Sequence, residues 1–112
     1  MKLIIAGLIA ASLSGSPVAV ASTGFASYYK SGKVTANGEP YNPNGLTAAH
    51  RNLPFGTKLK VTNLRTGKSV IVRINDRGPF IKRRVLDLSY GAARVIGLHR
   101  SGVAKIRFDV IE

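Results

Sequence analysis

Residues 58–79, KLKVTNLRTGKSVIVRINDRGP, decide the fold of this chain. Within them, residues 58–62 and 69–74 alternate apolar and polar side chains, as strands with one buried face do. The link between the two runs is short and contains Gly67, so we expect a β-hairpin. The side chains expected to face the core are Leu59, Val61, Val70, Val72 and Ile74.

Shorter elements surround this hairpin. Further strands are expected at residues 25–29, 46–49, 85–88 and 103–111. Residues 89–96 have the composition of a two-turn helix, which Asp87 or Ser89 would cap and Gly97 would end. Residues 30–45 are rich in Gly, Asn, Pro and Lys and predict a long loop. Short strands with one short helix predict a mainly-β fold, a small closed barrel without exposed sheet edges.

The first residues predict export. Lys2 precedes an apolar run that Ser-Gly-Ser-Pro ends too early for a membrane span of about 20 residues. An A-x-A site follows at residues 19–21, so we expect a signal peptide at residues 1–21, cleaved after Ala21. The mature domain would be residues 22–112, periplasmic or secreted. The chain has no Cys, so we expect neither a disulfide nor a lipid-attached membrane anchor. We also expect the protein to be a monomer.

The net charge of the chain indicates which partners it could bind. Lys and Arg number 17 against five acidic residues, a formal net charge of +12. Basic residues with Tyr28, Tyr29 and Tyr41 could stack nucleic-acid bases. Export makes anionic envelope polymers the better candidates, and we expect no nucleic-acid partner. The plainer alternative is that the charge only aids solubility.

Carboxylates are so rare that each deserves an explanation. Glu39, Asp76 and Asp87 are the only ones away from the C-terminus, and Asp76 ends an apolar strand in the run N-D-R-G-P. An Asp in such a run is also a common turn former, and Asp87 is more simply a helix cap. His50 and His99 lack metal-ligand spacing, so we expect no metal, and no cofactor motif occurs.

Several sequence blocks follow one another along the chain: G-F-A-S-Y-Y (24–29), T-A-N-G-E (35–39), L-T-A-A-H-R-N-L-P-F-G-T (46–57), V-T-N-L (61–64), V-R-I-N-D-R-G-P-F (72–80) and D-L-S (87–89). Together and in this order, they resemble the RlpA-like (rare lipoprotein A) proteins. The resemblance covers residues 24–111. It implies a six-stranded double-psi β-barrel, similar to barwin-like domains and to the first domain of expansins.

The resemblance also implies an activity and its residues. The family's activity is lytic transglycosylation of peptidoglycan glycan strands, preferably stripped of peptides, in cell-wall organisation and septation. Carried over by motif, Asp76 is the expected acid–base group, and Glu39 and His50 complete the catalytic set. We expect Arg73 and Arg77 to bind N-acetyl or lactyl oxygens. Tyr41 and Tyr28 are candidates for a sugar-stacking platform or for core aromatics.

The scarcity of acids fits this chemistry. Glycoside hydrolysis generally needs two carboxyl groups, whereas a lytic transglycosylase needs one that acts twice. The other function class is a non-catalytic, expansin-like module that binds or loosens wall polysaccharide. Release of 1,6-anhydromuramyl ends would distinguish the two.

Overall fold

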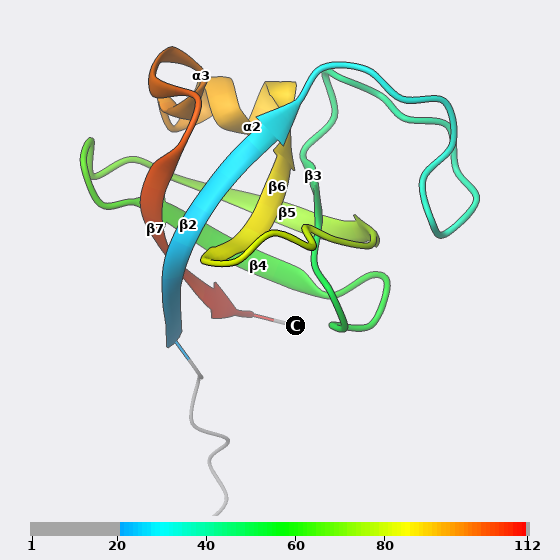
Figure 1. Ribbon diagram of the computed structural model, residues 1–112, viewed down its shortest axis with the longest axis horizontal. Coiled ribbons are helices and arrows are strands. Elements are labelled where there is room, and N and C mark those ends of the chain that lie inside the picture. Colours follow the sequence, from blue (N-terminus) through cyan, green and yellow to red (C-terminus); the bar gives the residue numbers. More distant parts are fainter. Residues whose placement is uncertain (1–20, 112) are drawn as a thin grey trace, which may run out of the picture.

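The computed structural model describes residues 21–111, and within them six strands close into a barrel in the order β2-β6-β3-β5-β4-β7 (Figure 1). The strands are β2 (Ala21–Tyr29), β3 (Thr47–Ala49), β4 (Lys58–Asn63), β5 (Ser69–Asp76), β6 (Arg84–Ser89) and β7 (Ala104–Val110). The helices α2 (Tyr90–Val95) and α3 (Leu98–Ser101) lie between β6 and β7. The predicted mainly-β barrel is confirmed.

The expected hairpin is β4–β5. Its antiparallel register sets Leu59 opposite Val72 and Val61 opposite Val70. All five side chains expected to face the core are buried, and Leu59, Val61 and Ile74 have no exposed surface. Inward residues of β2, β6 and β7 complete the core, with Leu86, Leu88 and Ile106 at 0 % exposure. The alternation in the sequence therefore identified the buried face correctly.

Parallel pairing brings the short strand β3 beside the end of β5. β3 pairs in parallel with β5 and antiparallel with β6, and Ala49 lies opposite Asp76. The backbone N–H of His50 donates to the carbonyl of Asp76 at 3.2 Å. Two residues predicted to share a site are thus neighbours through their backbones, although 26 positions separate them in the sequence.

The helical segment agrees with the sequence in one part and departs from it in another. Ser89 caps α2, and its Oγ accepts the N–H of Ala92 at 3.2 Å. The expectation of a single short helix was wrong for the described residues, because α3 follows at once. Gly97 adopts a left-handed conformation with φ 75°, so it ends one helix and lets the chain turn into the next.

The long loop between β2 and β3 is fastened to the barrel near its C-terminal end. The carbonyl of Gly45 accepts from Ser89 Oγ at 2.6 Å, and that of Pro43 accepts from Gly91 N at 2.7 Å. Gly91 allows this close approach, because a Cβ there would lie 3.0 Å from the Asn44 carbonyl oxygen and would press the loop outward. Figure 1 shows the rest of the loop, in cyan and teal, extending beside the barrel.

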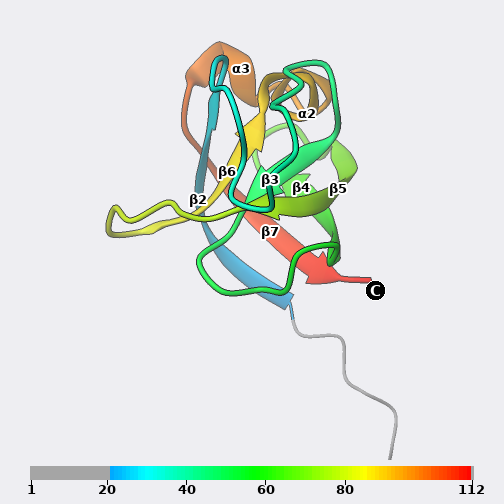
Figure 2. The same ribbon diagram turned by 90° about the vertical axis from the view of Figure 1, so that its right-hand side faces the viewer.

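The β5–β6 connection projects from the barrel wall (Figure 2). Arg51 braces its base by donating to the carbonyls of Pro79 and Arg84 at 2.9 and 3.2 Å. Phe80, near the tip, is 79 % exposed. An apolar side chain is therefore presented to solvent only a few residues after Asp76.

The expected signal peptide lies outside the described residues, except for Ala21, which begins β2 opposite Asp109. Between residues 21 and 111, no helix has the length and apolar character needed to cross a membrane.

Candidate functional site

Asp76 is the last residue of β5, and three donors hold its carboxylate. Oδ1 accepts the backbone N–H groups of Ala36 and Arg77, each at 2.9 Å. Oδ2 accepts the hydroxyl of Tyr29 at 3.1 Å. The donors come from the long loop, from the residue that follows β5 and from the end of β2. All three are neutral groups, so the carboxylate is oriented without a cation bound to it.

Tyr29 is the site residue that the sequence prediction missed. Burial raises the pKa of its hydroxyl, and the neighbouring Asp76 carboxylate raises it further, so the hydroxyl stays protonated and donates. Its ring stacks on Tyr41 with 4.6 Å between ring centroids. Strand alternation was the available signal: Tyr28 and Tyr29 must point to opposite faces, and only one of them can reach Asp76.

Tyr28 and Tyr41 were the tyrosines expected to contact sugar. The Tyr28 hydroxyl donates to the carbonyl of His99 in α3 at 3.3 Å, so it lies away from Asp76. The Tyr41 hydroxyl donates to the carbonyl of Tyr29 and accepts the N–H of Tyr90 at 3.2 Å. In this structure Tyr41 supports Tyr29, and the sugar-binding role of both tyrosines stays a prediction.

Glu39 is bound by a cation. Both of its carboxylate oxygens accept from the Arg73 guanidinium, at 2.8 and 2.9 Å. Asn37 Nδ2 adds a hydrogen bond to Oε1 at 2.8 Å. The hydrogen bonds from Arg73, followed by that from Asn37, lower the pKa of Glu39 to about 2. The guanidinium thus holds Glu39 in its anionic form more strongly than a free glutamate would be held, and much of the hydrogen-bonding capacity of Arg73 is already used.

The His50 imidazole closes its own turn. Nδ1 accepts the backbone N–H groups of Asn52 and Leu53, both at 3.1 Å. Burial lowers the pKa of His50, and the charges of Arg51 and Arg77 lower it further. A neutral imidazole that accepts at Nδ1 carries its proton on Nε2. Within residues 21–111, no hydrogen bond joins this ring to Asp76 or Glu39, so the structure pairs His50 with Asp76 through the backbone alone.

Arg77 binds the Asp76 carboxylate through its backbone N–H, but its guanidinium points elsewhere. Its guanidinium stacks on the Phe55 ring at 3.9 Å and donates to the carbonyls of Leu53 and His50 at 2.9 and 3.3 Å. It therefore fixes the turn after β3 to the end of β5. Its expected contact with substrate stays a prediction.

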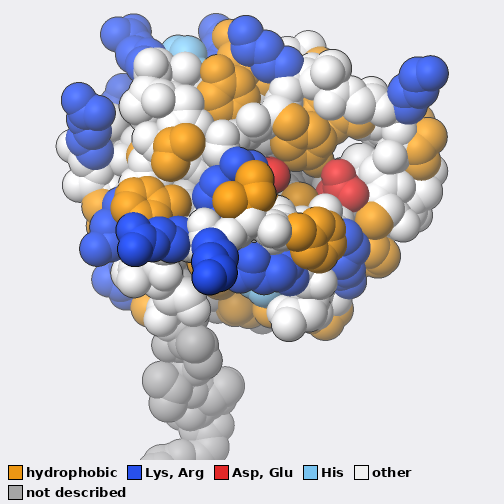
Figure 3. Space-filling view, in the orientation of Figure 1, with side chains coloured by type: hydrophobic (Ala, Val, Ile, Leu, Met, Phe, Trp, Pro, Cys, Tyr) orange, Lys and Arg blue, Asp and Glu red, His pale blue; other side chains and the backbone are white. Residues whose placement is uncertain are grey.

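The acidic residues of the described chain fall into two kinds. Glu39, Asp87 and Asp109 each form an ion pair, with Arg73, Arg84 and Arg107 respectively. Asp76 has no such pair among residues 21–111. Figure 3 shows acidic side chains beside a hollow of this face, with Lys and Arg side chains at several places around it.

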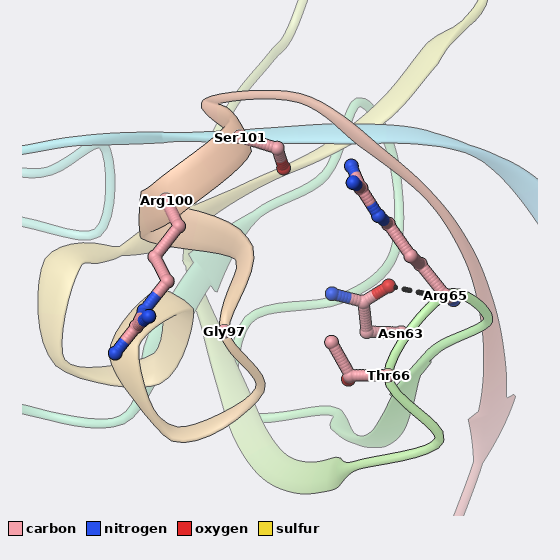
Figure 4. Close-up of a pocket in the computed structure, with 6 residues that line it drawn as sticks. All are labelled: Asn63, Arg65, Thr66, Gly97, Arg100 and Ser101. Atoms are coloured by element: carbon pink, nitrogen blue, oxygen red, sulfur yellow. Dashed lines mark hydrogen bonds between the residues drawn. The ribbon is translucent and has the colours of Figure 1, made fainter.

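A separate pocket of about 240 Å³ lies between the β4–β5 turn and α3 (Figure 4). Its lining residues are Asn63, Arg65, Thr66, Gly97, Arg100 and Ser101, none of which was a predicted site residue. Across the described residues, no group of three or more His, Cys, Asp or Glu side chains could hold a metal ion.

Known proteins resemble this chain in sequence and in fold. The family model described as lytic transglycolase matches residues 21–108. A probable endolytic peptidoglycan transglycosylase RlpA of a Synechocystis species is 62 % identical over 92 residues, which are 80 % of this chain and 29 % of the relative. The endolytic peptidoglycan transglycosylase RlpA of Campylobacter jejuni is 54 % identical over 99 residues, or 84 % of this chain and 36 % of that protein.

The fold also matches a solved structure. An apo expansin from Clavibacter michiganensis superimposes with a TM-score of 0.66 at 22 % identity, covering 83 % of this chain and 51 % of the expansin. That likeness supports the fold alone, and it agrees with a double-psi β-barrel. The family match and the close relatives show that this chain belongs to the lytic transglycolase family, as an RlpA-like double-psi β-barrel protein.

Proposed function

We propose that this chain is a lytic transglycosylase that cleaves peptidoglycan glycan strands, with Asp76 as its single acid–base group. The observation that carries the proposal is the pairing of the carboxylates. Among residues 21–111, Asp76 is the acidic residue without an arginine partner. It is held by two backbone N–H groups and one hydroxyl, which orient it without a bound cation.

The proposed reaction uses this carboxyl group twice. Protonated Asp76 gives its proton to the glycosidic oxygen as the bond from C1 of the muramic residue breaks. The C6 hydroxyl of the same residue then attacks C1, and the Asp76 carboxylate accepts the hydroxyl proton. The products are a 1,6-anhydromuramyl end and a free hydroxyl on the leaving sugar. Because the nucleophile belongs to the substrate, its effective molarity is high, of the order of 10⁵ M or more.

The state of Glu39 supports a mechanism with one proton carrier. An inverting or retaining hydrolase generally uses a second carboxyl group as base or nucleophile. Glu39 is instead bound at both oxygens by Arg73. In this proposal the Glu39–Arg73 pair binds substrate hydroxyl or amide groups beside the reacting bond.

The relatives support peptidoglycan as the substrate. Two of them, from a Synechocystis and a Nostoc species, are named probable endolytic peptidoglycan transglycosylase RlpA and are 62 % and 58 % identical to this chain over the aligned residues. The chain spans 29 % and 25 % of their lengths. We propose that this barrel alone supplies the cleavage, on peptide-stripped strands, in wall organisation and septation.

The same proposal includes a location. The apolar run and A-x-A site at residues 1–21 support export to the periplasm or the medium. The proposal also takes the exported protein to be a monomer without a stable membrane anchor. N-terminal sequencing of the protein recovered from an envelope fraction tests the export, and Ser22 as the first residue is the expected result.

Product analysis tests the activity. Purified protein is incubated with peptide-free glycan strands, and the products are separated and identified by mass spectrometry. Anhydromuramyl ends are expected from the wild-type protein and not from Asp76→Asn protein purified in the same way, which controls for contaminating enzymes. Binding of the strands without any cleavage would favour the expansin-like alternative. Reducing ends in place of anhydro ends would show a hydrolase.

A further inference from the structure

We infer that Tyr29 is a positioning residue that directs the Asp76 proton, so that Oδ2, and not Oδ1, exchanges it with the substrate. The catalytic part of this inference rests on the proposed function. The geometric part rests only on how the carboxyl group is held, and each part has its own test.

The two carboxyl oxygens of Asp76 differ in the number of lone pairs that remain free. Oδ1 accepts two backbone N–H groups, from Ala36 and Arg77, at 2.9 Å each. Two donors use both lone pairs of that oxygen, so a proton could sit there only by displacing a backbone group. Oδ2 accepts one donor, Tyr29, at 3.1 Å and keeps its second lone pair. Oδ2 is therefore the oxygen that can hold and release a proton.

The hydroxyl of Tyr29 also settles the direction of that proton. Because the hydroxyl occupies one lone pair of Oδ2, a proton on Oδ2 must lie along the other. The hydroxyl can keep donating in both states of Asp76, so the carboxyl group need not rotate between the acid step and the base step. A carboxyl group that does not reorganise between steps keeps the reacting atoms aligned.

Tyr29 is itself held by a chain of contacts that ends at α2. Its ring stacks on Tyr41 with an interplanar angle of 22°. The Tyr41 hydroxyl donates to the carbonyl of Tyr29 and accepts the N–H of Tyr90, the first residue of α2. Burial and the charge of Asp76 raise the pKa of the Tyr29 hydroxyl, which makes it a permanent donor and an unsuitable proton carrier. Its role is thus orientation.

Tyr29→Phe is the decisive variant because it removes the hydroxyl and keeps the stacked ring. We expect kcat on peptide-free glycan to fall roughly 10- to 100-fold, as a misaligned reacting group does, with KM nearly unchanged. Circular dichroism must show the wild-type fold, so that the fall in kcat reports on the reaction and not on the fraction of folded protein.

Two further variants make the test specific. Tyr90→Phe removes a hydroxyl that has no hydrogen-bond partner within residues 21–111, and it should leave kcat unchanged. The double variant Tyr29→Phe/Asp76→Asn should be no slower than Asp76→Asn alone, because Tyr29 acts through Asp76. An additive loss in the double variant, or a folded Tyr29→Phe protein with wild-type kcat, would overturn the inference.

A crystal structure of Tyr29→Phe decides the geometric part even if the wild-type protein cleaves nothing. Rotation or splitting of the Asp76 carboxyl group into two orientations supports the positioning role. A carboxyl group that stays in place on the two backbone N–H groups refutes it. Absence of anhydromuramyl products from the wild-type protein would count against the proposed function, and this structural readout would still decide the role of Tyr29.

Discussion

The two acidic residues expected in the catalytic set have opposite surroundings. Glu39 lies in the long loop, its oxygens bound by the guanidinium of Arg73 and its pKa held near 2. Asp76 ends a barrel strand and receives only neutral donors. A carboxylate tied to a cation is a fixed charge, whereas one held by neutral groups can be oriented and still exchange a proton. The partner of an acid therefore says more about its role than its place in a motif.

The largest expected effect comes from Asp76→Asn. The amide keeps the acceptor that bonds the Ala36 and Arg77 N–H groups but can neither give an acidic proton nor take one back. We expect a loss of roughly 10²- to 10⁴-fold in the rate of anhydromuramyl release, the range for a general acid–base group. Circular dichroism must show an unchanged fold. A folded Asp76→Asn protein with activity within a factor of two of wild type would show that Asp76 is not the acid–base group.

Ser89→Ala tests how the loop that carries Glu39 is fixed to the barrel that carries Asp76. Buried Ser89 Oγ donates to the Gly45 carbonyl and accepts the N–H groups of Thr47 and Ala92. Removing it leaves three backbone groups without this partner, so we expect the free energy of unfolding to fall by about 2 kcal/mol.

Urea titration measures this change. Ser101→Ala is the matched control, because exposed Ser101 makes one long hydrogen bond, at 3.4 Å. Its unfolding free energy should stay within about 0.5 kcal/mol of wild type. If the unfolding free energy of Ser89→Ala fell no further than that of Ser101→Ala, contacts other than those of Ser89 would hold the loop.

Glu39→Gln should lower kcat/KM about 10-fold, mainly through KM, because it weakens an ion pair that orients substrate and removes no proton carrier. Steady-state kinetics on the same glycan separates the two parameters. A loss as large as that of Asp76→Asn, and in kcat, would instead make Glu39 a second acid–base group.

The smallest expected effect is on stability in acid. The pKa of Glu39 falls from the usual 4.5 to about 2 on folding. A lowered carboxyl pKa stabilises the folded state above the unfolded-state pKa, and that contribution disappears as the pH falls from about 4.5 to about 2. Thermal unfolding followed across that range should show a steeper decline for wild type than for Glu39→Gln. Parallel curves would place the stabilising charge elsewhere.

The sequence predicted the periodic parts of the molecule well. Alternation located the faces of β4 and β5, and the serine at position 89 was recognised as a possible helix cap because hydroxyl caps act within a few residues. The family motifs predicted Asp76 as the acid–base group, and that role stays a prediction. These features depend on local chemistry or on recognisable sequence blocks.

The remaining features depend on contacts between distant residues. The ion pair of Glu39 with Arg73 joins positions 34 residues apart, and the bond from Tyr29 to Asp76 joins positions 47 apart. Composition does not distinguish Tyr28 from Tyr29, and only the strand's orientation in the closed barrel assigns one to α3 and the other to Asp76. His50 was expected to take part in catalysis, but what its imidazole binds could not be read from the motif. Its catalytic role stays a prediction.

The pairing of β2 with β7 has a mechanical consequence. The two strands are antiparallel, with Ala21 opposite Asp109 and Ala26 opposite Ala104, so both ends of the barrel domain leave from the same end of one ladder. A force pulling those ends apart would act across the ladder and open its hydrogen bonds one after another, beginning at Ala21. The barrel should therefore unzip under low tension when pulled by its ends. A load applied through the Asp76 face would act on the whole closed sheet.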